Sequence, residues 1–518
     1  MPRRIQHLST THSQYRFAQH RFAQHQNTME STVTDSVTQT VPGQPTTART
    51  SGATKRRLED LPAPRAWPLV GNLFELDPKQ LHAQLEKWGE QLGSTYTFKL
   101  GPKRILVTSN VDMVLSVLKD RPARFRRLST MEPVLKEMGG DGVFSSEGEA
   151  WRPQRDLVMR ALAPQQLESF FPTLQFITER LLRRWRRSAK AGTDTDVLQD
   201  LTRFTVDATA TLVFGKDVNT LEAGEDAIQR HLGVIFPMIS YRINALFPYW
   251  RYFRLPGDYR LDRSLKALRE FVAEMIAEAR ERMRRAPAEK PRNLLEAMLT
   301  LRDEPDSGFS DADVYANILT LLLAGEDTTA HSLAWAMHIL AGKPELQSQL
   351  QRAARNALGE ARAPMTFADT AKLGLFEGVA FEAMRMRTVT PVLFLEANET
   401  TELAGIEIPK GTPVFVLTRP ASLDDNNYRD AKAFTPERWV AQREGTRDGH
   451  NPKAFLHFGA GPRFCPGRYL ATLEMKMALA TLSRNFSVEY AEDPETTKEV
   501  FAFTMMPSRL RLRLSALA

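Results

Sequence analysis

The sequence contains one cysteine, Cys465, among 518 residues. A lone cysteine excludes a disulfide within the chain, and it excludes zinc or iron–sulfur sites that need several cysteines. The lack of paired cysteines agrees with a reducing compartment. Most intracellular cysteines are buried and inert. The remaining special uses of Cys465 are those of a single thiolate, either a nucleophile or an axial metal ligand.

Long apolar stretches are also absent. No run of about 18 apolar residues occurs, so no transmembrane anchor is predicted, and the N-terminus has no apolar signal segment. No repeat of solenoid length is present. Hydrophobic residues nevertheless make up 42% of the chain, which is enough for a large core.

The net charge of +7 is concentrated near the N-terminus. Residues 1–29 carry four arginines and no acid, so the basic balance does not require a nucleic-acid partner. Residues 1–57 are predicted to be a disordered leader, and residues 58–518 form the globular domain. An acid-free, arginine-rich leader suits a mitochondrial transit peptide. The leader could equally be upstream sequence, with the true start of the protein at Met29. Of the two locations, the cytoplasm is favoured over the mitochondrion.

The residues around Cys465 predict a rigid loop before a helix. Two glycines and two prolines lie between Gly461 and Gly467, which stiffens the backbone and lets it approach a flat group closely. A helical pattern follows Gly467. The N–H groups and the dipole of that helix, with Arg463, favour a thiolate at Cys465. A nucleophilic cysteine needs a histidine base, and His457 is the nearby candidate.

The run Phe458-x-x-Gly461-x-Arg463-x-Cys465-x-Gly467 resembles the haem-binding loop of the cytochromes P450, the haem-thiolate monooxygenases. The resemblance implies that Cys465 is the axial ligand of a haem b iron and that its thiolate favours O–O cleavage. It also implies that Arg463 meets a haem propionate and that Phe458 belongs to the cofactor site. The fold it implies is mainly α with a smaller β region.

A long helix is predicted from the Ser310 cap to Ala341, before Gly342 and a proline. Its middle, residues 324–329, is poor helix material, which indicates either a packed kink or a functional site. This segment resembles the dioxygen-activating motif of the same family. The resemblance implies that Thr328 assists dioxygen activation and that Asp327 relays protons from solvent.

Two further patterns agree with that family. Glu382 and Arg385 lie one helical turn apart, and on their own they are an ordinary surface pair. With Arg438 downstream, they resemble the buried ionic triad beneath the haem. Trp151 and Arg155 resemble the pair that donates hydrogen bonds to the haem propionates. Residues 394–396 lack the arginine that holds one haem propionate in many relatives. That propionate therefore either binds another donor or lacks the usual one.

A lid and a substrate pocket are expected from apolar segments. Residues 236–253 mix aromatic residues with arginines, a pattern compatible with a membrane surface, nucleic acid or a hydrophobic lid. Prolines and a glycine should break the segment into loop and short helix, which favours the lid. The candidate pocket residues, implied by family position, are Ala324, Val389, Val392 and Met505. They indicate a hydrophobic small-molecule substrate.

The β-strands are expected to form hairpins. Thr95–Leu100 and residues 105–108 should pair around a Gly-Pro turn, and residues 501–514 should form a terminal hairpin.

The function that follows is insertion of one oxygen atom from O₂ into an apolar substrate by a soluble, stand-alone, bacterial-like enzyme. Its electrons come from a separate donor, a ferredoxin with its reductase or a flavodoxin-type protein, which meets Arg463, Arg468 and Lys476. Two alternatives remain open. One is a haem-thiolate peroxygenase or isomerase, and the other is a non-catalytic haem protein that binds gas.

Overall fold

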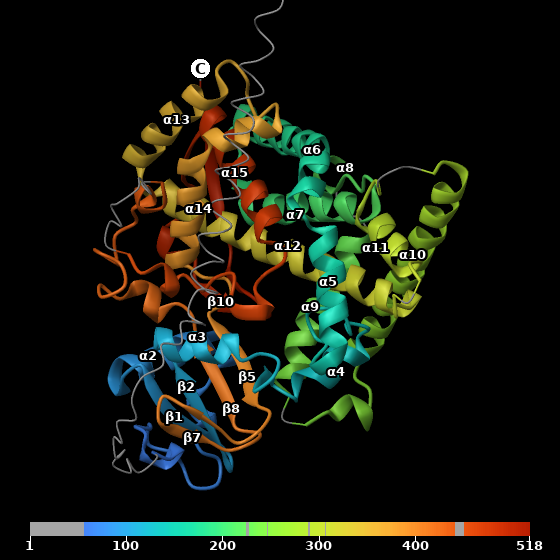
Figure 1. Ribbon diagram of the computed structural model, residues 1–518. Helices are drawn as coiled ribbons and strands as arrows, with labels where there is room; N and C mark the ends of the chain where they lie inside the picture. Colours follow the sequence, from blue (N-terminus) through green and yellow to red (C-terminus); the bar gives the residue numbers. More distant parts are fainter. Residues whose placement is uncertain are drawn as a thin grey trace, which may run out of the picture. The chain divides into compact units, whose positions relative to one another are not determined.

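The computed structural model describes residues 56–223, 227–245, 247–287, 291–305, 307–440 and 450–517 (Figure 1). The predicted leader therefore lies outside the described residues, apart from its last two. Arg56 of that pair donates its backbone N–H to the carbonyl of Gly405 (3.1 Å) and accepts from the N–H of Glu407 (2.9 Å). Arg56 therefore continues the backbone pairing of a small hairpin.

Helices make up most of the described chain. In order, they are α2 (Leu81–Leu92), α3 (Val111–Lys119), α4 (Met131–Glu137), α5 (Trp151–Ala161), α6 (Pro164–Ala191), α7 (Val197–Phe214), α8 (Thr220–Ala223), α9 (Ala227–Ile243), α10 (Pro256–Arg285), α11 (Leu294–Arg302), α12 (Asp311–Ala341), α13 (Pro344–Leu358), α14 (Gly374–Met386) and α15 (Arg468–Asn485). The helix α12 packs against α7, α14 and α15, which surround it in Figure 1.

The strands form four small sheets. The largest has the order β1-β2-β8-β5-β3 and lies to one side of the helices, near α2 and α3. Its strands β2 and β8 run parallel, and its other neighbours are antiparallel. The strands are β1 (Thr95–Leu100), β2 (Lys103–Thr108), β3 (Phe125–Arg127), β4 (Thr195–Asp196), β5 (Val392–Ala397), β6 (Thr401–Leu403), β7 (Ile406–Ile408), β8 (Pro413–Leu417), β9 (Phe486–Tyr490), β10 (Glu499–Phe501), β11 (Met505–Pro507) and β12 (Arg511–Ala516). The mainly α fold with a smaller β region is confirmed.

The boundaries of α12 follow from local chemistry, as the sequence predicted. The Ser310 hydroxyl accepts from the N–H of Asp313 (3.2 Å), and the Asp313 carboxylate accepts from the N–H of Ser310 (2.9 Å). This reciprocal cap satisfies N–H groups that have no partner within the helix. At the other end Pro344 starts α13, and proline at a first helical position leaves no N–H unsatisfied. The helix continues without a break through residues 324–329.

The main hydrophobic core joins α5, α6, α7, α12, α14 and α15. A second cluster lies in the five-stranded sheet, where Leu106 and Val414 face each other across the parallel pair and are fully buried. Burying a side chain of this size contributes roughly 1.5–3 kcal/mol. The helical core fixes α12 and the helices around it relative to one another.

Two predictions about local structure are wrong. Pro237 does not break the lid segment but lies inside α9, where the buried side chains of Ile235 and Ile239 hold the helix in place. Residues 501–514 do not form one hairpin. Instead β10 pairs with β11, whereas β12 pairs with β9 and β4. The partner of each of these strands is set by long-range contacts, and the local sequence does not indicate that partner.

Candidate active site

The Cys465 loop is held by short backbone contacts. The N–H of Cys465 donates to the carbonyl of Phe458 (2.8 Å), and the N–H of Phe464 donates to that of Gly461 (3.0 Å). A 3-10 turn, η10 (Gly461–Arg463), precedes the cysteine, and α15 begins three residues after it. The loop thus places Cys465 just before a helix N-terminus, as the sequence predicted.

Gly461 lets this loop press against α3. Its φ is 66°, in the left-handed region that favours glycine. A Cβ atom at this position would lie 2.5 Å from the carbonyl oxygen of Leu118 and 2.9 Å from its carbon. Backbone atoms cannot move aside as a flexible side chain can, so only glycine fits here.

Burial and the neighbouring donors and charges act in opposite directions on the pKa of the Cys465 thiol. Burial raises the pKa of the thiol, while the N–H groups of Gly467 and Arg468 and the charges of Arg155 and Arg468 lower it. Burial outweighs the other effects, so the chain alone favours the thiol, contrary to the sequence-based expectation. Binding to a metal ion removes the thiol proton outright. Two backbone donors aimed at sulfur then suit a thiolate ligand.

His457 is not arranged as a base for Cys465. Its Nδ1 lies 2.9 Å from the Thr388 hydroxyl, and its Nε2 lies 3.3 Å from the Ser422 hydroxyl. Burial lowers the pKa of His457 to about 3, so the ring is neutral. Both ring nitrogens are therefore engaged elsewhere, which removes the support for a cysteine–histidine nucleophile.

A group of buried arginines surrounds Glu147 beside the Cys465 loop. Arg463 donates to the Glu147 carboxylate (2.7 Å) and to the carbonyl of Ser146 (2.7 Å). Arg121 lies 3.5 Å from the other carboxylate oxygen, which accepts the backbone N–H of Arg127 (3.1 Å). The guanidinium of Arg127 donates to the carbonyl of Phe144 (3.0 Å) and stacks on its ring.

This group has more positive charge than Glu147 can balance. Burial and the neighbouring guanidinium groups lower the pKa of Arg127 to about 9, and the same causes lower that of Arg463 to about 10. The Nε atoms of Arg121, Arg127 and Arg463 are buried without a hydrogen-bond partner in the described part of the chain. Buried donors and crowded cations fit an anionic ligand with oxygen acceptors, such as the two haem propionates.

Trp151 and Arg155 lie at the start of α5, next to this group. The guanidinium of Arg463 covers the Trp151 ring, with its carbon 4.4 Å from the ring centroid. Arg155 is close enough to Cys465 for the sulfur to affect its pKa, which burial lowers. The structure thus brings Trp151, Arg155, Arg463 and Cys465 together. Phe458 is buried and packs edge-on against Phe381, with ring centroids 6.0 Å apart.

The middle of α12 carries the second half of the site. The Thr328 hydroxyl donates to the carbonyl of Ala324 (2.9 Å), one turn earlier. Ala324 is exposed although the surrounding helix is buried, so this stretch borders a space wide enough for solvent. Burial raises the pKa of Asp327 to about 6. Burial and the adjacent Asp327 raise that of Glu326 further.

The charges of Glu382, Arg385 and Arg438 meet in the core. Arg385 donates to both oxygens of Glu382 at 2.8 Å, and Arg438 donates to one of them at 3.0 Å. Trp439, which the sequence did not indicate, donates its indole N–H to the other oxygen (2.8 Å). All three charged side chains are at most 5% exposed, and Arg385 also donates to the carbonyls of Ser422, Ala431 and Ala433.

The candidate pocket residues divide into two groups. Val389 and Met505 pack with Trp335 in a separate apolar cluster, and Val392, the first residue of β5, belongs to an apolar cluster on the β-sheet. These three side chains are at most 5% exposed. Ala324, in contrast, is exposed.

Three phenylalanine rings from distant segments converge instead. Phe503 lies 5.9 Å from Phe144 and 6.0 Å from Phe236, measured between ring centroids. Phe144 also stacks on Arg127, which ties this apolar group to the buried arginines.

The lid segment is tied to α4 through Glu137. The 3-10 turn η5 (Tyr249–Arg251) joins α9 to α10. In it, the indole N–H of Trp250 donates to Glu137 (2.7 Å), and Arg251 donates to the other carboxylate oxygen (2.8 Å). Arg242 and Asp258 form a buried ion pair (2.7 Å) beneath the turn. The lid is therefore held by polar contacts at its tip and its base.

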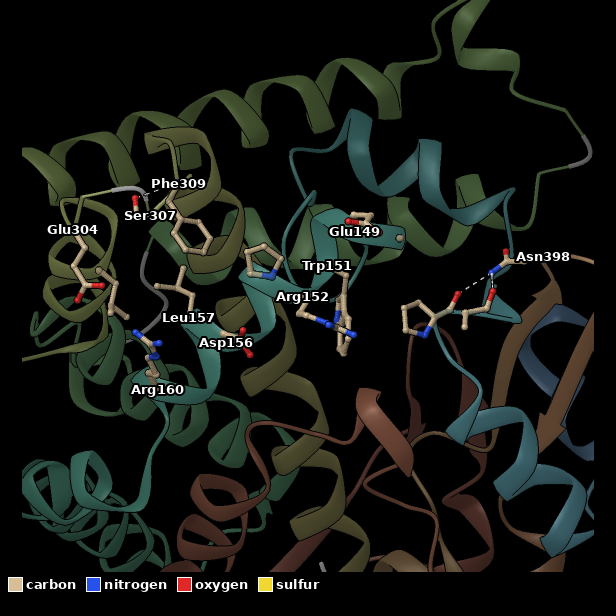
Figure 2. Close-up of a pocket in the computed structure, with 15 residues that line it drawn as sticks. Glu149, Trp151, Arg152, Asp156, Leu157, Arg160, Glu304, Ser307, Phe309 and Asn398 are labelled. Carbon is tan, nitrogen blue, oxygen red and sulfur yellow. Dashed lines mark hydrogen bonds between the residues drawn. The ribbon is translucent and has the colours of Figure 1, made fainter. Parts of the chain in front are cut away.

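A surface cavity of about 820 Å³ lies along the outer side of α5 (Figure 2). Trp151 borders it, and Arg152, Asp156 and Arg160 of α5 line it, with Glu304 opposite. None of Cys465, Asp327 and Thr328 is among its lining residues, so of the candidate site residues this cavity meets only Trp151.

Sequence reasoning missed several of these residues. One local signal was present for the group of Arg121, Arg127 and Glu147, because residues 121–127 contain four arginines. The sequence does not indicate, however, that these side chains meet in the folded protein. His331 follows Asp327 by four residues, a spacing that places both on one helix face. The structure brings the His331 Nε2 within 3.9 Å of the Asp327 carboxylate.

Comparisons with known proteins show the family of the chain. The family model Cytochrome P450 matches residues 61–514. Pentalenene oxygenase of Streptomyces avermitilis is 25% identical over 456 residues, which cover 88% of this chain and 97% of the relative. Cytochrome P450 4V2 of Rattus norvegicus is 25% identical over 449 residues, covering 82% and 83%. A self-sufficient cytochrome P450 monooxygenase of Aspergillus kawachii is 25% identical over 464 residues, covering 88% of this chain and 43% of the relative.

The fold and these matches define a haem-thiolate monooxygenase, an oxidoreductase that uses haem iron, O₂ and electrons from a redox partner. The chain belongs to the cytochrome P450 family. The three named relatives come from a bacterium, a mammal and a fungus. Within the described residues, no helix is both long and apolar enough to cross a bilayer.

Proposed function

We propose that this enzyme oxygenates an apolar small molecule at a haem b held by Cys465. The observation that carries the proposal is the group of buried arginine Nε donors beside the Cys465 loop. These donors have no acceptor among the described residues, and haem carboxylates supply acceptors of the right charge. The residues that would hold the haem are Cys465, Arg463, Trp151, Arg155 and Phe458, to which the structure adds Arg121 and Arg127.

Haem bound at Cys465 supplies the redox chemistry that activates dioxygen. The N–H groups of Gly467 and Arg468 would stabilise the sulfur of Cys465 as a thiolate once it is bound to the iron, and the buried arginines would neutralise the propionates. The triad of Glu382, Arg385 and Arg438 is a structural support, because its carboxylate and guanidinium groups satisfy one another and nearby carbonyls. None of its groups is available to a substrate.

Asp327 and Thr328 are proposed to deliver protons. Since the pKa of Asp327 is raised to about 6, its carboxyl group can both take up and release a proton near neutral pH. The Thr328 hydroxyl donates to Ala324 at rest and can turn its hydrogen toward the pocket. This arrangement favours dioxygen activation over a peroxygenase or an isomerase, and it counts against a gas-binding protein, which requires no proton relay.

The substrate is proposed to lie between Ala324 and the three rings of Phe144, Phe236 and Phe503. These groups are apolar, and the three rings lie close together. Burial of apolar surface against them contributes roughly 25 cal/mol per Å², so an apolar substrate without formal charge suits this wall.

The electron donor is proposed to be a separate ferredoxin or flavodoxin-type protein in the same compartment, with the cytoplasm favoured. Arg463, expected at the contact, is 7% exposed and engaged with Glu147, so it does not meet the donor. Arg152 and Arg160 are exposed on the outer side of α5, the helix that begins with Trp151 (Figure 2). An acidic donor docking there would lose affinity in salt.

The test is a screen of apolar compounds against the purified haem protein. Substrate binding should shift the iron spin state in the absorbance spectrum, and a hit should then be turned over with a reductase and ferredoxin. Turnover with peroxide but not with reductase and ferredoxin would overturn the monooxygenase assignment in favour of a peroxygenase. The donor surface is tested by Arg152→Glu and Arg160→Glu, which should raise the KM for the donor and leave substrate binding unchanged.

A further inference from the structure

His331 occupies a buried position between the proposed proton relay and the β10–β11 turn. It lies one helical turn after Asp327 on α12 and is 4% exposed. Its Nδ1 is 2.9 Å from the hydroxyl of Thr504, and its Nε2 is 3.9 Å from the nearer oxygen of Asp327. The second distance exceeds a hydrogen bond, so a hydrogen bond between His331 and Asp327 requires the two groups to approach each other.

The imidazole of His331 is neutral at physiological pH, because burial lowers its pKa to about 4. The charged or titratable groups that face it are few. Asp327 lies on the same helix, Glu326 is next to Asp327, and the β10–β11 turn contributes the uncharged Thr504. On the α7 side, the Thr205 hydroxyl donates to the carbonyl of Glu326 (2.9 Å).

A neutral histidine can serve both protonation states of Asp327. With Nε2 protonated it donates to the carboxylate, while Nδ1 accepts from the Thr504 hydroxyl. With Nδ1 protonated it donates to the Thr504 oxygen, while Nε2 accepts from a protonated Asp327. The Thr504 hydroxyl allows His331 to change between these two tautomers, since a hydroxyl can act as donor or acceptor. A charged lysine or arginine in the same place would hold Asp327 ionised.

We propose that His331 is a positioning residue that aims the Asp327 carboxyl group and links it to the substrate-contacting turn through Thr504. The inference rests on the proposed relay role of Asp327. His331 touches neither substrate nor haem in this scheme. It acts through Asp327 alone.

The turn is suited to transmit the presence of substrate. Phe503, adjacent to Thr504, is one of the three converging rings. The N–H of Met505 donates to the carbonyl of Val389 (2.9 Å), and that of Ala502 donates to the carbonyl of Thr504 (3.1 Å). These bonds hold the turn on both sides of Thr504. A substrate that moves Phe503 therefore moves the hydroxyl that sets the orientation of His331.

The first experiment measures the Asp327 carboxyl group directly. In the haem-loaded protein, infrared difference spectra between pH values contain the C=O stretch of protonated Asp327, which Asp327→Asn identifies by its loss. His331→Leu removes the hydrogen-bond donor of the carboxylate and should move the titration midpoint of this band to higher pH. Thr504→Val removes the hydroxyl that holds the His331 ring and should move the midpoint in the same direction. His331→Gln keeps a donor and an acceptor and should restore the midpoint. His338→Gln is the matched control, since His338 lies on the same helix and contacts Trp335 of that helix and Tyr490 of β9.

The second experiment measures the fraction of reducing equivalents recovered as product. His331→Leu should lower this fraction by roughly threefold to tenfold, the effect of losing one hydrogen bond, with little change in substrate affinity. An unmoved band in both His331→Leu and Thr504→Val overturns the inference even if Asp327→Asn is impaired. A moved band together with full product yield in Asp327→Asn would instead refute the relay role of Asp327 and leave the His331 contact standing.

Discussion

The guanidinium of Arg463 lies over the indole ring of Trp151, with its carbon 4.4 Å from the ring centroid. This contact joins the loop before α15 to the first residue of α5, although 312 positions separate the two in sequence by the difference of their numbers. A cation on an aromatic face contributes ~0.5–2 kcal/mol. It orients Arg463 beside Glu147 and the other buried arginines, so the side chains proposed to bind the haem already lie together in the protein alone.

Replacement of the single cysteine tests the proposed iron ligand. Cys465→Ala should abolish the red-shifted carbon-monoxide spectrum of the reduced protein, because no other residue supplies a thiolate. Haem content is measured separately, so that loss of the spectrum is distinguished from loss of the cofactor. A variant that retains the red-shifted band would show that the assignment of Cys465 is wrong.

The buried arginines should govern how tightly haem is held. Arg127→Gln removes a buried guanidinium and should accelerate haem transfer to apomyoglobin by roughly 10- to 100-fold, since a charge-assisted hydrogen bond contributes ~1.5–3 kcal/mol. Arg126→Gln is the matched control, because the adjacent Arg126 pairs with Glu132 and not with Glu147. Equal transfer rates for the two variants would exclude Arg127 from the cofactor site.

The Glu382 carboxylate should dominate local stability. Glu382→Gln leaves Arg385 and Arg438 buried without their counter-charge, which should cost about 3–5 kcal/mol in the free energy of unfolding. Glu437→Gln changes the same motif at an exposed position, where the carboxylate accepts only from Gln349, and should cost less than ~0.5 kcal/mol. Urea unfolding followed by circular dichroism measures both. Similar losses in the two variants would contradict the special role of Glu382.

The sequence correctly predicted those features that are determined by residues close together in the chain. Ser310 and Asp313 cap α12 through neighbouring atoms, and the start and end of that helix were therefore correct. Pro237 was wrongly expected to interrupt the lid, because core packing around α9 overrides its local preference. The Cys465 loop was likewise recognised from residues that lie close together in the sequence.

The rest depends on contacts between distant segments. Arg127 donates its backbone N–H to Glu147, and no local pattern around Arg127 indicates that partner. Thr504 and His331 are 173 residues apart. The assignment of residues 501–514 to one hairpin failed for the same reason, since β12 pairs with β9 and β4. Pairwise geometry of this kind is not contained in periodicity or capping patterns.

Asp327 should make stability depend on pH. Burial raises its pKa from 3.8 to about 6, so the folded state binds the proton more tightly than the unfolded chain. The resulting stabilisation is complete below pH 3.8 and is lost as pH rises through about 6. Asp327→Asn carries no charge and should be more stable than the native protein at pH 8, by up to about 3 kcal/mol, and similar to it at pH 4.

Urea unfolding at several pH values tests this difference. Asp262→Asn is the control, because that carboxylate is 50% exposed and pairs with Arg254 at the surface, and it should show no such dependence. A constant difference between Asp327→Asn and the native protein across the pH range would mean that Asp327 is not a buried titrating group.

The Glu137 carboxylate should set the rate at which substrate enters. Glu137→Gln weakens the contacts to Trp250 and Arg251 that fasten the lid to α4. Substrate association, followed by stopped-flow absorbance, should become faster by roughly 2- to 10-fold, as expected for losing a charge-assisted contact. Glu132→Gln, on the same helix but paired with Arg126, should leave the rate unchanged. An unaltered rate in Glu137→Gln would show that this contact does not limit entry.

The single cysteine also makes this chain convenient for spectroscopic labelling. In the proposed holoenzyme the thiol of Cys465 is bound to iron and does not react with maleimides. A cysteine introduced by Tyr252→Cys, at a side chain that is 79% exposed beside the lid turn, would then be the one reactive thiol of the protein. A fluorophore or spin label attached there would follow lid opening in real time, with no native cysteine to remove first.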